Sequence, residues 1–83
     1  MRKVMVESPT YRRAVMAWEL AQKKIPWAWT KIRKNPLMLE CAATDTTYYF
    51  CCYAEENKLY GFHGEIHSLY DFEGAIEKGE MPK

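Results

Sequence analysis

Two histidines and three cysteines are the residues of this chain whose types could bind a metal ion or act in nucleophilic catalysis. His63 and His67 are four residues apart, a spacing that would place both imidazoles on one face of a helix. A zinc-protease helix also needs a glutamate directly after the first histidine, and Gly64 occupies that position. The histidine spacing therefore does not predict a zinc protease.

The cysteines do not complete a metal site by their spacing. Cys51 and Cys52 are adjacent, so their side chains would point to opposite faces of a regular strand and could not ligate one ion. A site made of Cys41, Cys52, His63 and His67 is geometrically conceivable, but it lacks the Cys-x-x-Cys pairs that identify structural zinc sites. We therefore expect no metal and no cofactor, and we expect reduced cysteines that pack as small apolar residues.

Catalysis by a cysteine would require a basic partner and a lowered thiol pKa. Cys51 and His63 could form such a pair, but neither a helix N-terminus nor a basic cluster is adjacent to Cys51 in the chain. Glu55 and Glu56 are adjacent acidic residues that fit a solvated turn rather than a catalytic pair. The sequence also contains no Gly-rich phosphate loop and no nucleophile elbow. We predict from these features that the chain is not an enzyme.

Aromatic residues provide a first candidate binding surface, for a protein partner. Trp, Tyr, Met and Arg are enriched at the centres of protein interfaces, and this chain has three Trp, six Tyr and five Met. Strand alternation predicts that one face of a sheet, opposite the core, carries the contact residues for a protein partner: Tyr49, Tyr53, Tyr60 and Phe62. The alternative is that a helix or the Trp-rich segment covers this face.

A second candidate surface would bind single-stranded nucleic acid. Trp27 and Trp29 are two residues apart and could stack on bases. Lys31, Arg33 and Lys34 follow them and could bind phosphates. Nucleic acid is therefore the alternative partner.

The charge distribution is compatible with either surface. Residues 1–36 carry nine Lys and Arg against two acidic residues, a net charge of +7, whereas residues 37–83 carry a net charge of −6. Such an asymmetry fits an anionic partner on one side, and it fits equally well two halves that attract each other when they pack together.

Periodicity predicts the elements that must position these side chains. Residues 37–62 indicate an antiparallel β-meander whose third strand covers residues 58–62. A two-residue turn at Thr44-Asp45 would pair Cys41 with Tyr48. This register predicts a core face made of Leu37, Leu39, Cys41, Tyr48, Phe50 and Cys52.

An N-terminal helix is predicted over residues 9–24. Ser8 is its expected N-cap and Pro9 its first helical residue. Apolar residues recur at helical spacing on one side of this segment, with Trp18 as the main anchor against the sheet.

A C-terminal helix is predicted over residues 69–78. Ser68 and Asp71 fit a capping box, and Gly79 fits a left-handed stop. Gly74 inside this helix predicts a close approach of another backbone or a weak helix.

The remaining segments add strands at the start and the middle of the chain. Residues 2–7 have the β-branched character of an edge or central strand. Residues 27–33 alternate at period two and are predicted as a strand, with a short helix beginning at Pro26 as the alternative. Lys34, Asn35 and Pro36 then form the turn into the meander.

Together these features predict one α+β domain over residues 1–83. An antiparallel sheet of three to five strands (meander 37–62) packs against the helices at 9–24 and 69–78. No signal peptide is present and no apolar run approaches the ~20 residues of a spanning helix, so we expect a cytoplasmic protein without membrane contact, as a monomer or small homo-oligomer.

The predicted function is that of a small, non-catalytic protein-binding module, an inhibitor or adaptor that occludes a larger protein. By analogy with bacteriophage and mobile-element proteins of similar size, an anti-defence role is a further hypothesis. Binding of single-stranded nucleic acid is the alternative function.

Overall fold

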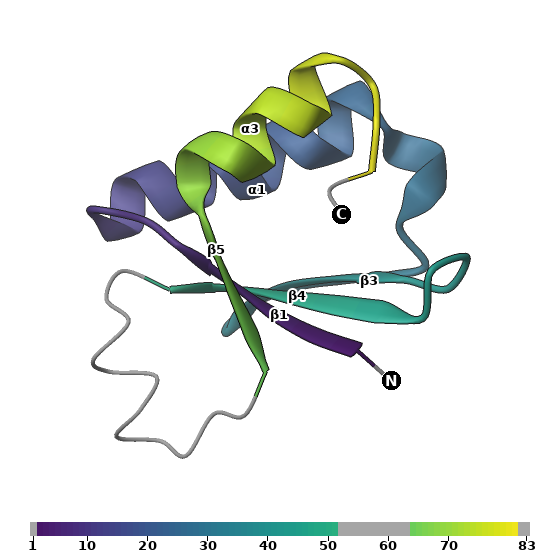
Figure 1. Ribbon diagram of the computed structural model, residues 1–83, viewed down its shortest axis with the longest axis horizontal. Coiled ribbons are helices and arrows are strands. Elements are labelled where there is room, and N and C mark those ends of the chain that lie inside the picture. The colour runs from purple at the N-terminus through teal and green to yellow at the C-terminus, as the bar shows by residue number, and fades with distance from the viewer. Residues whose placement is uncertain (1, 52–63, 82–83) are drawn as a thin grey trace.

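The computed structural model describes residues 2–51 and 64–81 (Figure 1). The elements in chain order are β1 (Arg2–Glu7), α1 (Tyr11–Lys24), the 3₁₀ helix η1 (Pro26–Ala28), β2 (Lys31–Lys34), β3 (Leu37–Cys41), β4 (Thr46–Cys51), β5 (Glu65–Ser68) and α3 (Leu69–Glu77). The five strands form one sheet, and α1 and α3 cover the same face of it (Figure 1). The predicted α+β class, with a sheet and two helices, is confirmed.

The sheet is mixed, so the prediction of a purely antiparallel sheet is wrong. The strand order is β2-β3-β4-β1-β5, and β1 runs parallel to both of its neighbours, β4 and β5. The pairs β2–β3 and β3–β4 are antiparallel. Parallel strands need a long crossover connection, and α1 lies in the chain between β1 and the later strands. In β1, Val4, Met5 and Val6 are consecutive apolar residues and all are buried, a run that is typical of a strand with parallel neighbours.

The hairpin between β3 and β4 differs in register from the prediction. Cys41 pairs with Thr46 across a turn of four residues, 42–45, whereas the predicted two-residue turn paired Cys41 with Tyr48. The register is therefore displaced by two residues. Because side chains alternate between faces with period two, a displacement of two keeps the same side chains on the same face. The predicted core residues on β3 and β4 that the structure describes are accordingly buried: Leu37, Leu39, Cys41, Tyr48 and Phe50.

Helix α1 begins two residues later than the predicted start at Pro9. Its N-cap is Thr10, whose hydroxyl accepts a hydrogen bond from the Arg13 backbone N–H at 3.1 Å. Ser8, the predicted cap, is instead buried before the helix starts. Trp18 packs into the core and donates its indole N–H to the Met38 carbonyl at 3.2 Å, which ties α1 to β3.

Helix α3 has the expected signals at both ends. The Ser68 hydroxyl accepts a hydrogen bond from the Asp71 N–H at 3.1 Å. At the C-terminal end, Gly79 has a φ of 73°, and the N–H groups of Gly79 and Glu80 donate to the carbonyls of Ile76 and Ala75. These two hydrogen bonds form a Schellman motif, in which a glycine at positive φ reverses the chain.

The core lies between the two helices and the sheet, and aromatic rings run through it. Trp29 and Tyr48 meet edge to face with ring centroids 5.8 Å apart, and Phe72 of α3 contacts both Tyr48 and Phe50 in the same way at 5.5 and 5.2 Å. Edge-to-face pairs at these separations contribute attraction beyond simple burial of area. This aromatic cluster fixes the sheet to α3 and to the segment that follows α1.

The segment after α1 combines the two alternatives that the sequence left open, a short helix beginning at Pro26 and a strand. Residues 26–28 form η1, as the alternative of a short helix at Pro26 proposed, and the strand begins only at Lys31. A proline at the first position of a helix loses no hydrogen bond, which explains the helical start. The predicted strand over residues 27–33 is therefore correct only in its second half.

Candidate protein-binding surfaces

The two tryptophans proposed to stack on bases lie in different environments. Trp29 is only 8% exposed, and its indole N–H donates to the Ala21 carbonyl at 3.0 Å. Trp27, in η1, is 76% exposed. Stacking on Trp29 would require the core to open, so the pair does not form a stacking platform in this fold, and Trp27 alone remains available.

The predicted phosphate-binding residues lie together on an edge strand. In the part of the chain that the structure describes, β2 is the first strand in the sheet order and pairs only with β3. All four of its residues, Lys31, Ile32, Arg33 and Lys34, are exposed. We call Trp27 together with β2 the basic edge. One side of β2 has no strand partner within the described residues, so backbone N–H and C=O groups face outwards there.

Of the four aromatic residues predicted to contact a protein, only Tyr49 belongs to the described part of the chain. Tyr53, Tyr60 and Phe62 lie outside residues 2–51 and 64–81, as does the predicted third strand at 58–62. Tyr49 lies on the face of the sheet opposite the helices, as predicted, and is half-buried. These contacts stay predictions.

The face around Tyr49 is more buried than an open binding face would be. Strand pairing places Met38 of β3, Met5 of β1 and Ile66 of β5 in one row with Tyr49. Met5 and Met38 are buried, and Ile66 at the β5 edge is 43% exposed. The accessible apolar surface of this row is therefore concentrated at its edge.

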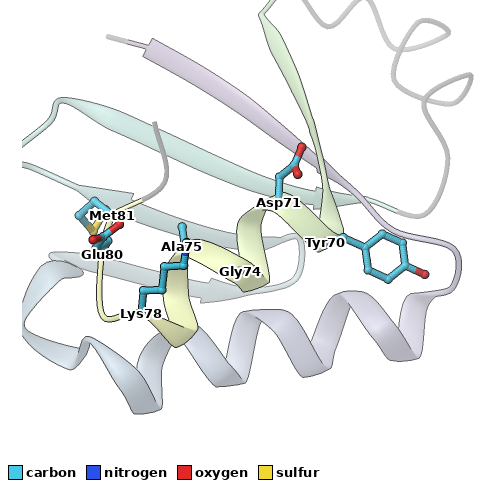
Figure 2. A pocket seen from close by; sticks show the side chains of 7 residues that line it. All are labelled: Tyr70, Asp71, Gly74, Ala75, Lys78, Glu80 and Met81. Carbon is cyan, nitrogen blue, oxygen red and sulfur yellow. The ribbon is translucent and has the colours of Figure 1, made fainter.

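A groove along α3 is a surface that the sequence did not indicate (Figure 2). It has a volume of about 420 Å³ and is lined by Tyr70, Asp71, Gly74, Ala75, Lys78, Glu80 and Met81. Tyr70, Gly74 and Lys78 are spaced by four residues and so follow one side of the helix. The Schellman reversal at Gly79 brings Glu80 and Met81 back to close the groove.

Two features make the groove suited to contact with another molecule. Tyr70 is 70% exposed and points away from the helix (Figure 2). Gly74 lies in the middle of α3, where a Cβ added to it would meet no atom within 4 Å. Of the two alternatives predicted for Gly74, the close approach of another backbone is therefore not found among the described residues. A helix-interior glycine costs about 1 kcal/mol relative to alanine, and packing among residues 2–51 and 64–81 does not require it.

An ionic cluster joins β1 to β5 at the other edge of the sheet. The Arg2 guanidinium donates to both carboxylate oxygens of Glu65, with Nη2 2.9 Å from Oε1. His67 Nε2 lies 3.5 Å from the same oxygen. The hydrogen bond from Arg2 is the main cause that lowers the pKa of Glu65 from 4.5 to about 2. A carboxylate of such low pKa is a weak general base, so this cluster supports strand pairing rather than catalysis.

Among the described residues, the remaining candidate residues do not assemble a metal site. Cys41 on β3 is buried with a free thiol, and Cys52 and His63 lie outside the described residues. Within residues 2–51 and 64–81, no group of three or more His, Cys, Asp or Glu side chains is arranged to hold a metal ion. No helix within residues 2–51 and 64–81 is long and apolar enough to cross a membrane.

Comparison with known protein families, curated proteins and solved structures finds no similar protein.

Proposed function

We propose that this chain is a small, non-catalytic protein-binding module, an inhibitor or adaptor that acts by covering part of a larger protein. The observation that carries the proposal is the α3 groove, where an exposed tyrosine stands beside a glycine that packing among the described residues does not require. The groove is the surface through which we expect the partner to bind.

The composition of the groove supports this proposal. Protein interfaces combine an apolar or aromatic centre with a polar rim, and tyrosine is enriched among the residues that contribute most binding energy. Here Tyr70, Ala75 and Met81 supply apolar surface, while Asp71 and Lys78 supply charges beside it. Gly74 leaves space at the middle of this surface, which a side chain of the partner can fill.

Binding of single-stranded nucleic acid at the basic edge is the second candidate function. It is favoured by the exposure of Trp27 next to Lys31, Arg33 and Lys34. The burial of Trp29 weakens it, because one of the two aromatic platforms is unavailable.

The experiment that tests the groove separates binding from stability at one residue. In Gly74→Gln the helix gains a good helix former, so the free energy of unfolding rises by about 0.5–1 kcal/mol, while the new side chain occupies the groove. Gly74→Ala gives a similar gain in stability but adds only a methyl group. We expect the glutamine variant to lose the protein partner captured from a cell lysate and the alanine variant to keep more of it.

Tyrosine variants provide a matched control. Tyr70→Ser should strongly reduce capture of that partner, because truncation of a tyrosine that acts as an interface hot spot costs about 2 kcal/mol or more. Tyr11→Ser removes an exposed tyrosine at the start of α1, outside the groove, and should leave capture unchanged. Equal capture by wild type, Gly74→Gln and Tyr70→Ser would contradict the proposed role of the groove.

A further inference from the structure

The basic edge combines three properties that a docking site for an extended polypeptide needs. β2 is an edge strand whose outer side has no strand partner within the described residues. Three of its four residues are cationic, and the fourth, Ile32, is 50% exposed. We propose that an acidic, extended segment of a partner protein pairs with β2 and continues the sheet at this edge.

The charge around β2 selects for an acidic partner. Lys23 and Lys24 occupy the last turn of α1, ahead of η1, and residues 20–39 contain five cationic and no acidic side chains. Strand pairing places one acidic residue, Glu40, opposite Lys31. The edge therefore remains strongly positive after this pairing, and a segment rich in Asp or Glu is attracted to it.

The alternation of β2 specifies the pattern of the segment. Arg33 pairs with Met38 and Lys31 with Glu40, so Lys31 and Arg33 share the face of the sheet opposite the helices. Ile32 points to the other face. A partner strand with acidic residues two apart would place them beside Lys31 and Arg33, and a β-branched residue between them would lie beside Ile32.

Two other occupants fit this edge less well. A second copy of the chain would bring one cationic β2 against another, and like charges on edge strands oppose such pairing. A single-stranded nucleic acid would use the charges and Trp27, but its backbone cannot continue the ladder of N–H and C=O groups. Of these three occupants, only an acidic polypeptide uses both the charges and the side of β2 that has no partner strand among the described residues.

The basic edge is a different surface from the α3 groove, and peptide binding to it is tested independently of the groove. The probe is a synthetic peptide in which glutamate alternates with valine, added to the full chain and followed by NMR. We expect saturable shifts at β2 and slower amide hydrogen exchange on its outer side, because new backbone hydrogen bonds protect amides. A peptide with lysine in place of glutamate should not bind.

A second peptide separates strand pairing from charge attraction. It keeps every side chain but is N-methylated at every residue, so neither of its edges can donate backbone hydrogen bonds. We expect its affinity to be on the order of tenfold weaker, a difference of about 1.4 kcal/mol. Equal affinity for both acidic peptides would overturn the strand-pairing proposal, as would failure of the unmodified peptide to bind.

Protein variants locate the site. Arg33→Glu should weaken binding of the glutamate–valine peptide, whereas Lys78→Glu, in the α3 groove, should not. An oligothymidylate that binds more tightly than the peptide, without protection of β2 amides, would instead identify the edge as a nucleic-acid site and overturn the proposal. Tyr70→Ser, which should lose the lysate partner, should still bind the glutamate–valine peptide. Failure of the groove proposal is therefore distinguishable from failure of the strand-pairing proposal.

Discussion

Trp27 and Trp29 are separated by one residue but belong to two regions that differ in almost every physical respect. Trp29 is part of the aromatic cluster between the helices and the sheet, where its ring contacts Tyr48 and its indole N–H is hydrogen-bonded. Trp27 belongs to the basic edge, where it is mostly exposed. One tryptophan stabilises the fold, and the other contributes apolar surface that the fold does not bury.

The difference shows which residues of a small domain are available for binding. The aromatic cluster is saturated by contacts within the chain, so its residues cannot serve a partner without unfolding. Exposed apolar side chains such as Trp27 and Tyr70 are not needed by the core, and a partner can cover them at little cost to stability. We therefore look for function at the basic edge and the α3 groove rather than among the most aromatic strands.

The largest expected effect tests this contrast directly at the two tryptophans. Trp29→Ala should lower the free energy of unfolding by ~3–5 kcal/mol, because it removes a large buried side chain and leaves a cavity. Trp27→Ala should change it by no more than about 0.5 kcal/mol. Urea denaturation of both variants, followed by circular dichroism, measures the difference. Similar losses for the two variants would mean that Trp27 is also part of the core.

A second comparison sets adjacent residues of β4 against each other. Phe50 faces the helices and contacts Phe72, so Phe50→Ala should destabilise the fold by ~3 kcal/mol or more. Tyr49 lies on the opposite face and is half-buried, so Tyr49→Ala should cost markedly less, about 1 kcal/mol. Thermal unfolding of the two variants gives the comparison. Equal losses would show that the sheet is covered on both faces, which would remove Tyr49 as a contact for a partner.

The sequence was sufficient where a local physical rule determines the outcome. Period-two alternation assigned Leu39 and Tyr48 to the core face, and this assignment survived an error of two residues in the turn. The capping serine before α3 and the glycine after it could likewise be predicted, because each allows hydrogen bonds to backbone groups that lie within a few residues of it in the chain.

The sequence was insufficient where distant segments decide the outcome. The parallel pairing of β1 with β4 and β5 depends on which strands α1 and α3 bring together, and alternation within a strand does not report its neighbours. The same holds for Trp29, whose burial follows from contacts with Ala21 and Tyr48. The spacing of Trp27 and Trp29 in the sequence suggested that both lie on one surface. In the structure η1 exposes Trp27, whereas Trp29 packs into the core.

The α3 groove was missed for a different reason. Tyr70, Gly74 and Lys78 recur every four residues, and this helical spacing was available in the sequence. For Gly74 the sequence predicted either a close approach of another backbone or a weak helix, and neither alternative is a contact from outside. The open space at its Cα shows that a helix glycine can also leave room for a contact from outside.

The smallest expected effect concerns the β5 edge, which is held by an exposed ion pair rather than by the core. Arg2 lowers the pKa of Glu65 to about 2, so the folded state favours the ionised carboxylate more than the unfolded state does. A lowered pKa contributes stability that is present above 4.5, the ordinary value of this carboxyl group, and is lost as the pH falls through 4.5 towards 2. Because the pair is exposed, salt should reduce its contribution to stability.

Carboxyl NMR should give a Glu65 titration midpoint well below 4.5 in the wild type and a midpoint closer to 4.5 in Arg2→Gln. In urea denaturation, Glu65→Gln should lose less stability than the wild type between roughly pH 5 and pH 2. A wild-type midpoint at 4.5 would show that the pair does not persist in solution, and β5 would then depend on its backbone pairing with β1 and on the packing of α3.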